Sequence, residues 1–254
     1  MRASELERWQ SRQGEIVNAH ARVGGELREL VIPSAIPDSV LLQYDGGNYS
    51  GGDSEWQDDT GTNDMVLTGG ESETTVNSND AVAFDGTDDY GLIDMEAIDH
   101  SLNEWTLEFV YSSTTNERNR IFGWEDGDNR LGIGPNRDNE FDSDSGNAVF
   151  RLRDPNDTRL SFDPGRDDLF DGDQHAVTWI NDGSTQNGQE VIIDGTEQSL
   201  NFFNADSPDM TAPDRDLAVA GSDNGPVESL TEIDFVAIRW HDKAIEGQTI
   251  TDMI

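Results

Sequence analysis

From about residue 80 to residue 240, the chain repeats one local pattern: a short apolar run followed by a cluster of Gly, Asp, Asn, Ser or Pro. Several of these runs alternate, and in one of them Trp105, Leu107 and Phe109 are separated by polar residues. Alternation with a period of two predicts strands with one buried face, and closely spaced strands predict a two-sheet antiparallel sandwich or a barrel. The predicted strands are residues 81–84, 90–95, 105–112, 120–124, 130–134, 148–153, 159–162, 175–180, 190–194, 199–203, 217–221 and 232–240.

Residues 173–195, DQHAVTWINDGSTQNGQEVIIDG, are typical of a β-hairpin. Two apolar runs flank a loop of small polar residues, and Asp194-Gly195 predicts a tight turn at the end of the second run. His175 would then lie on a strand, hydrogen-bonded and structural. We do not expect it to be catalytic.

The charge balance is extreme, with 53 Asp and Glu against 16 Lys and Arg and a formal net charge of −37. Such a chain repels polyphosphates, so we expect no nucleic-acid partner. Six Trp and ten Phe supply a core, which argues against disorder. Of the acidic residues 34 are Asp, and Lys243 is the single Lys. We therefore expect a folded protein adapted to high salt, where carboxylate repulsion is screened.

Residues 1–30 differ from the rest because five Arg balance five Glu. In the same segment, a mostly apolar set of residues recurs at alternating spacings of three and four, which is a heptad pattern. This pattern predicts a helix that packs against copies of itself, with a trimer favoured. The alternative is an amphipathic helix packed on its own domain. We expect residues 1–30 to be an oligomerisation and docking segment, 31–79 an extended linker with Gly/Asp-rich loops, and 80–254 the β domain. The seam positions are Leu6, Trp9, Gln13, Ile16, His20, Val23 and Leu27.

Five motifs, in order, resemble those of laminin G-like modules. They are FDGTDDYGLIDM (84–95), WTLEFVYS (105–112), FDGDQHAVTWINDGSTQNGQEVIIDG (170–195), LAVAGSDN (217–224) and IDFVAIRWHDKAIEGQTITDM (233–253). The resemblance covers residues 80–254 and implies a concanavalin A-like jelly roll. Gln174 departs from it, because the family usually has Trp before the His.

The resemblance also implies a calcium site, since related jelly rolls often hold Ca²⁺ through carboxylates and carbonyl oxygens. Asp85, Asp88 and Asp234 occupy the motif positions where such a site would form. The alternative is that these carboxylates belong to the general acidity of the chain.

Two further patterns bear on ligands and catalysis. The segment WEDGDNR (124–130) places an aromatic ring beside hydrogen-bonding side chains, an arrangement typical of sugar sites. Its Trp also fits a core position. EIDF (232–235) resembles the E-x-D strand of glycoside hydrolases, but Val236 and Ala237 stand where the acid would be, so we expect no enzyme. The candidate sugar-site residues are Trp124, Asp126, Asp128 and Asn129.

Together these features predict a non-catalytic virion surface protein of a virus of salt-loving archaea: a tail-fibre, spike or head-decoration subunit. Its N-terminal segment would bind other virion proteins, and its lectin-like head would bind a host surface glycan or glycoprotein. The first residues show no apolar core of signal-peptide length, and no apolar run is long enough to span a membrane. The alternatives are a glycan-active enzyme of the same fold and a purely architectural virion protein.

Overall fold

The computed structural model describes residues 19–23, 26–30, 39–61, 63–95, 103–115, 120–126, 129–135, 148–210, 215–223 and 227–245. The chain divides into two compact units, Met1–Asp38 and Ser39–Ile254. Among the residues described, no helix has the length and apolar character needed to cross a membrane.

In the first unit, β1 (Ala19–Val23) and β2 (Glu26–Leu30) form an antiparallel hairpin with Ala19 opposite Leu30. The helix expected over 1–30 is therefore wrong for these ten residues, and His20, Val23 and Leu27 lie on strands. Gly24-Gly25 stands between the two strands in the sequence, and Gly-Gly is typical of two-residue hairpin loops. The other seam positions, Leu6, Trp9, Gln13 and Ile16, lie outside the residues described.

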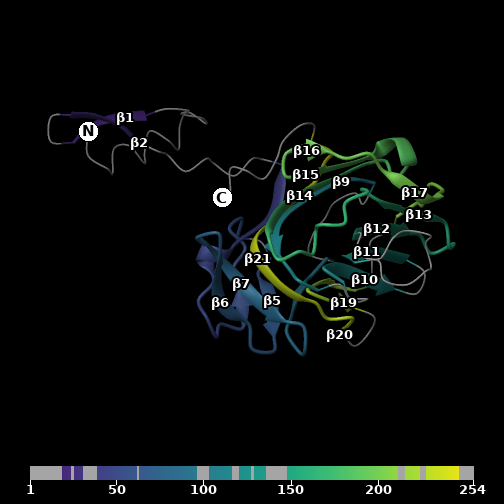
Figure 1. Cartoon of the computed structure of the whole chain (residues 1–254), viewed down its shortest axis with the longest axis horizontal. Coiled ribbons are helices and arrows are strands. Elements are labelled where there is room, and N and C mark those ends of the chain that lie inside the picture. Colours follow the sequence, from purple (N-terminus) through teal and green to yellow (C-terminus); the bar gives the residue numbers. More distant parts are fainter. Residues whose placement is uncertain are drawn as a thin grey trace. The chain divides into compact units, whose positions relative to one another are not determined.

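The second unit is a sandwich of two antiparallel sheets (Figure 1). The first sheet has the order β16-β15-β14-β9-β21-β7-β6, with β3 also paired to β21. Its central strands β14 and β9 are held in register over their whole length, with Gln174 opposite Ser112 and Asp182 opposite Glu104. Its strands are β3 (Val40–Asp45), β6 (Ser72–Val76), β7 (Asn79–Asp85), β9 (Glu104–Ser112), β14 (Gln174–Asp182), β15 (Gln189–Ile193), β16 (Thr196–Glu197) and β21 (Glu232–His241).

The second sheet has the order β17-β13-β12-β11-β10-β18-β8-β5-β4, with β19 beside β10 and β20 beside β19. Its strands are β4 (Glu55–Trp56), β5 (Met65–Thr68), β8 (Tyr90–Ile93), β10 (Phe122–Asp126), β11 (Asn129–Pro135), β12 (Ala148–Arg153), β13 (Arg159–Asp163), β17 (Asn201–Ala205), β18 (Leu217–Val219), β19 (Ser222–Asp223) and β20 (Val227–Glu228). Short 3₁₀ turns occur at Gly46–Asn48 and Gln186–Gly188.

The core lies between the sheets and is rich in aromatic rings. Trp105 lies 5.0 Å from Trp240 and 4.7 Å from Trp179 between ring centroids, and all three come from the first sheet. Phe150 of the second sheet meets Trp179 edge-on at 5.1 Å. Such ring pairs contribute about 0.5–1.5 kcal/mol beyond the area that they bury. The alternation seen in the sequence therefore does point one face of each strand into a shared core.

Residues 40–79 are part of the sandwich, which corrects the extended linker expected over 31–79. β3 pairs with β21, β6 with β7, and β5 with β8. Gly- and Asp-rich loops do separate these strands, and β3 and β5 alternate buried with more exposed residues as half-buried strands do. Residues 31–38 lie outside the described part of the chain.

Candidate functional site

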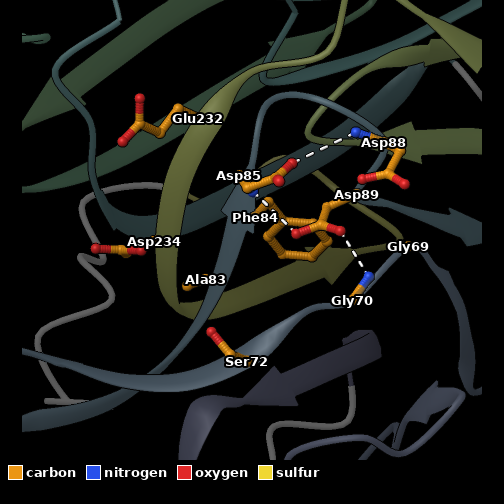
Figure 2. A pocket seen from close by; sticks show the side chains of 10 residues that line it. All are labelled: Gly69, Gly70, Ser72, Ala83, Phe84, Asp85, Asp88, Asp89, Glu232 and Asp234. Carbon is orange, nitrogen blue, oxygen red and sulfur yellow. Dashed lines mark hydrogen bonds between the residues drawn. The ribbon is translucent and has the colours of Figure 1, made fainter.

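A pocket of about 390 Å³ opens where three segments meet: the β5–β6 turn, the β7–β8 turn and the start of β21 (Figure 2). Half of the residues that line it carry a carboxyl group, and none of these lining residues is basic. The lining residues are Gly69, Gly70, Ser72, Ala83, Phe84, Asp85, Asp88, Asp89, Glu232 and Asp234. We call this the acidic pocket.

The β7–β8 turn is shaped by Asp85, the last residue of β7. Its Oδ1 accepts hydrogen bonds from the backbone N–H groups of Thr87 (2.7 Å) and Asp88 (3.4 Å), as in an Asx turn. Gly86 follows with φ +72°, and a Cβ there would lie 2.7 Å from the backbone nitrogen of Glu232. Glycine is therefore needed to bring this turn against β21.

Asp89 joins the two turns that form the pocket wall. Its side chain is buried, with Oδ2 accepting the N–H of Asp85 at 3.0 Å and Oδ1 accepting the N–H of Gly70 at 2.6 Å. A buried carboxylate needs such donors, because the loss of water is otherwise costly. Asp89 thus fixes the position of the neighbouring carboxylates.

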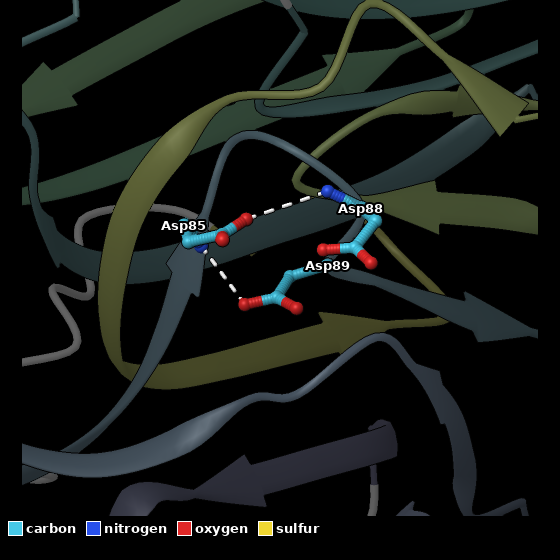
Figure 3. A group of neighbouring side chains, drawn as sticks. All are labelled: Asp85, Asp88 and Asp89. Atoms are coloured by element: carbon cyan, nitrogen blue, oxygen red, sulfur yellow. Dashed lines mark hydrogen bonds between the residues drawn. The ribbon is translucent and has the colours of Figure 1, made fainter.

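Asp85, Asp88 and Asp89 each offer one carboxylate oxygen within 4.8 Å of the others (Figure 3). The structure brings together two of the predicted calcium residues and adds Asp89, while Asp234 lines the same pocket without joining this group. Hard oxygen ligands of this kind suit Ca²⁺, which takes about 6–8 of them. Three carboxylates fit part of such a shell, and water or ligand hydroxyl groups would supply the rest.

Glu232 and Asp234 stand two residues apart on β21, so both side chains point to one face of the strand. Figure 2 shows them on the opposite side of the pocket from Asp88. Burial raises the pKa of Asp234, and the nearby charge of Glu232 raises it further. Negative charge is therefore concentrated in this pocket, which favours a bound cation.

No protein family and no curated protein matches the chain by sequence. Solved structures do match. The binding domain of Paraclostridial Mosquitocidal Protein 1 aligns with a TM-score of 0.60 and 10% identity, over 83% of this chain and 50% of that one. The fold is a concanavalin A-like jelly roll.

Two other matched structures carry sugar-related descriptions. Domain 4 of AbnA, a GH43 extracellular arabinanase from Geobacillus stearothermophilus, in complex with arabinotriose, matches with a TM-score of 0.58 and 16% identity, over 85% of this chain and 98% of that one. Botulinum neurotoxin type C, described as interacting with two ganglioside molecules, matches with a TM-score of 0.58 and 11% identity, over 83% of this chain and 49% of that one. The chain thus spans about half the length of the two toxin structures.

The predicted sugar site around Trp124 is not formed as expected. Trp124 is fully buried in the core of the jelly roll, so its ring face is not open to a sugar. Its alternation with Phe122 on β10 already favoured a core position. Asp126 and Asn129 lie opposite each other on β10 and β11, and Asp128 falls outside the residues described.

A second hollow, of about 580 Å³, adjoins the β6–β7 hairpin. Its lining is polar, and its one aromatic residue, Tyr49, is buried. Across the part of the chain that the structure describes, Val66 is the only large hydrophobic side chain that is exposed. No aromatic side chain is largely exposed there, and Tyr90, Phe202 and Phe203 are half-buried. The hollow is lined by Gly46, Gly47, Tyr49, Ser50, Glu73, Thr74, Thr75, Asp80 and Ala81.

His175 has the structural role expected of it. The imidazole is buried between two carboxylates, with Nδ1 3.1 Å from Asp194 Oδ2 and Nε2 3.3 Å from Asp171 Oδ1. Burial disfavours the charged ring, but these two carboxylates outweigh it and raise the pKa of His175. Asp194-Gly195 forms the predicted turn, with φ +51° and +75°, between the paired residues Ile193 and Thr196.

Proposed function

We propose that the jelly roll is a non-catalytic, lectin-like domain that binds a glycan at the acidic pocket with the help of a divalent cation such as Ca²⁺. The observation that carries the proposal is the gathering of five carboxyl groups at one pocket, three from the β7–β8 turn and two from the start of β21. Sugar hydroxyl groups are suitable oxygen ligands for a cation held by carboxylates. The arabinanase domain in complex with arabinotriose supports this proposal by analogy of fold.

We further propose that this domain is the head of a virion surface protein, as a tail-fibre, spike or head-decoration subunit of a virus of salt-loving archaea. The net charge of −37 supports a high-salt setting. The charge-balanced residues 1–30 support a segment that faces protein, either other copies or other virion proteins. A host surface glycan or glycoprotein is the partner that fits such a head.

A glycan array probed with the full chain in high-salt buffer, with and without Ca²⁺, tests the binding function. We expect retention on at least one glycan, weakened by removal of Ca²⁺. Asp88→Asn should lower the affinity for Ca²⁺ about tenfold or more, because affinity follows the number of ligand charges. Asp182→Asn, an exposed carboxylate at the end of β14, is the matched control and should bind normally. Binding of no glycan, or equal loss in both variants, would contradict the proposal.

A glycan-active enzyme is the second candidate, because Glu232 and Asp234 place two carboxyl groups in one pocket. Glycoside hydrolysis requires a pair of carboxyl groups at a defined separation across the scissile bond. A polysaccharide screen at high salt separates the two functions. Turnover abolished by Glu232→Gln would establish the enzyme, whereas binding without turnover supports the lectin.

Oligomerisation and location need separate tests. The mass of the full chain in high salt, compared with that of a chain starting at Ser39, shows whether residues 1–38 cause the chain to oligomerise. Binding of the chain to host cells would favour adhesion, and its absence would favour a purely architectural role.

A further inference from the structure

The strand β6 (Ser72–Val76) forms one edge of the first sheet (Figure 1). In the part of the chain that the structure describes, it pairs with β7 and with no other strand. The side chains of Ser72, Glu73 and Thr75 are exposed. An open edge presents unpaired backbone N–H and C=O groups, which can pair with a further strand.

The register of the β6–β7 hairpin shows which backbone groups of β6 point outwards. Its two-residue loop, Asn77-Ser78, has φ values of +50° and +75°, as in a type I′ turn. The flanking residues Val76 and Asn79 therefore form a hydrogen-bonded pair. Hydrogen-bonded and non-hydrogen-bonded pairs alternate along antiparallel strands. Thr75, opposite Asp80, is in a non-hydrogen-bonded pair, so its N–H and C=O point away from β7.

The loop after β3 limits the open part of this edge to its second half. The N–H of Gly51 donates a hydrogen bond to Glu73 Oε1 at 2.8 Å, and the hydroxyl group of Tyr49 donates to the carbonyl oxygen of Glu71 at 2.9 Å. A Cβ on Gly51 would lie 3.7 Å from the backbone nitrogen of Glu73. Among the described residues, no such loop contact reaches the backbone of Thr75. Thr75 is therefore the open point of the edge.

The second hollow, of about 580 Å³, gives a ligand room beside this open point. Glu73, Thr75 and Asp80 line it from the hairpin, and Gly47 and Ser50 line it from the loop after β3. All five residues are exposed. A short extended segment could thus reach Thr75 without displacing the loop.

Other strands at the edges of the two sheets are shorter, irregular or covered. β4 and β16 have two residues each, and the pairing of β17 with β13 contains a register shift. The free side of β3 is occupied, because the N–H of Gln43 donates to Asp58 Oδ1 and its C=O accepts the N–H of Asp59. Short strands, bulges and covering loops are the usual protection of sheet edges. β6 pairs with β7 over five residues without a register shift, and it contains no Pro or Lys.

The charge around Thr75 favours a basic partner. Glu73 and Asp80 carry exposed carboxylates, and no basic residue lines the hollow. Both share a face of the hairpin with Thr75, because Asp80 is its cross-strand partner and Glu73 precedes it by two residues. A Lys or Arg side chain of an added strand would therefore lie near them. A second copy of this chain fits less well, since two surfaces of a protein with a net charge of −37 repel each other.

We propose that the open edge of β6 at Thr75 binds an extended, basic peptide segment of another protein by strand addition. The N–H and C=O of Thr75 pair with the backbone of the peptide, and its basic side chains enter the hollow beside Glu73 and Asp80. The hollow and the acidic pocket share no lining residue, so this site is separate from the proposed glycan site.

A fluorescently labelled, capped peptide in which Val and Lys alternate tests the proposal by anisotropy with the full chain in high-salt buffer. We expect saturable binding, and weaker binding of the same peptide with Glu in place of Lys, because like charges across a strand pair are destabilising. Thr75→Pro should weaken binding about tenfold or more, since it removes an outward N–H that the β6–β7 ladder does not use. Thr75→Ala keeps this N–H and is the matched control, which should bind normally.

Two N-methylated forms of the peptide give a second measurement that needs no protein variant. One form is methylated at the Val nitrogens and the other at the Lys nitrogens. An added strand pairs along only one of its edges, and the N–H groups of alternate residues point to opposite edges. One form should therefore lose binding, and the other should keep it.

Several outcomes would overturn the inference. These are no saturable binding of the peptide, equal binding of Thr75→Pro and Thr75→Ala, or equal effects of the two methylated forms. Binding of a neutral oligosaccharide that Thr75→Pro weakens would make the hollow a sugar site instead. A mass above that of the monomer that Thr75→Pro reduces would assign the edge to a second copy. None of these results bears on the acidic pocket, which Asp88→Asn tests. Circular dichroism of each variant confirms that it is folded.

Discussion

The acidic pocket and a group of arginines on the second sheet concentrate opposite charges by different means. We call this group the arginine stripe; it consists of Arg130 on β11, Arg151 and Arg153 on β12, and Arg159 on β13. The pocket is assembled from two turns and a strand end that are far apart in the sequence, with Gly86 and Asp89 holding the turns together. The stripe follows from the register of three adjacent strands in one sheet. Like charges meet in both regions, but Arg153 and Arg159 share Asp157 as a counter-ion.

The pKa values of the carboxyl groups shift in opposite directions in the two regions. In the pocket, burial and then Glu232 raise the pKa of Asp234. In the stripe, Arg159 lowers the pKa of Asp157. A carboxylate in the pocket therefore opposes folding unless a cation binds, whereas a carboxylate in the stripe supports it. The charge of the pocket favours a bound cation, whereas part of the charge of the stripe is already balanced by Asp157.

Lowering the salt concentration should have the largest effect. The screening length is about 3 Å at 1 M salt and about 10 Å at 0.1 M, so dialysis exposes the repulsion of the net charge of −37. We expect loss of β structure by circular dichroism, partly reversed by Ca²⁺ if the pocket is a main source of repulsion. An unchanged spectrum in low salt would show that the acidic surface is not an adaptation to high salt.

Gly86→Ala should have the next largest effect, because it disrupts the contact between the β7–β8 turn and β21 that forms the pocket. The new Cβ would meet the backbone of Glu232 at a φ of +72°, and we expect a loss of about 1–3 kcal/mol in the free energy of unfolding. Gly183→Ala is the matched control: its φ is +83°, and an added Cβ there has nothing within 4 Å. It should cost about 1 kcal/mol at most. Equal losses in denaturant titrations would mean that the close approach to β21 is unimportant.

Two Asp→Asn variants should shift stability in opposite directions by smaller amounts. Because the folded pKa of Asp234 is raised, its ionised form disfavours folding above that pKa, and the penalty disappears as pH falls below it. Asp234→Asn should therefore raise stability at neutral pH by a few tenths of a kcal/mol and change little in acid.

Asp157 has a lowered folded pKa, so its contribution is present at neutral pH and is lost as pH falls through that pKa. Asp157→Asn should lower the melting temperature slightly at neutral pH and have no effect in strong acid. Melting temperatures of both variants from about pH 1 to about pH 7 check the two signs. The same sign for both would remove the contrast between the two regions.

The long strands of the sandwich were predictable from the sequence because their signal is local. Residues 148–153 were predicted and form β12, and 232–240 were predicted within β21. Alternation fixes which side chains are buried, and turn residues fix where strands end. β4 and β5 were missed because β4 has only two residues, and the alternation of β5 covers four residues between loops rich in Gly, Asp and Asn. The heptad spacing in residues 1–30 was misleading, since Ala19–Val23 and Glu26–Leu30 form strands.

The mainly β class, the tight turn at Asp194-Gly195 and the net charge of −37 could all be read from the sequence. The contact of Asp89 with Asp85, the enclosure of Trp124 and the rows of arginines on three strands became visible only in the folded protein. Strand formation depends largely on neighbours along the chain, so short stretches of sequence can predict it. Which strands pair, and in what register, depends on how two whole sheets pack, and no short stretch of sequence carries that information.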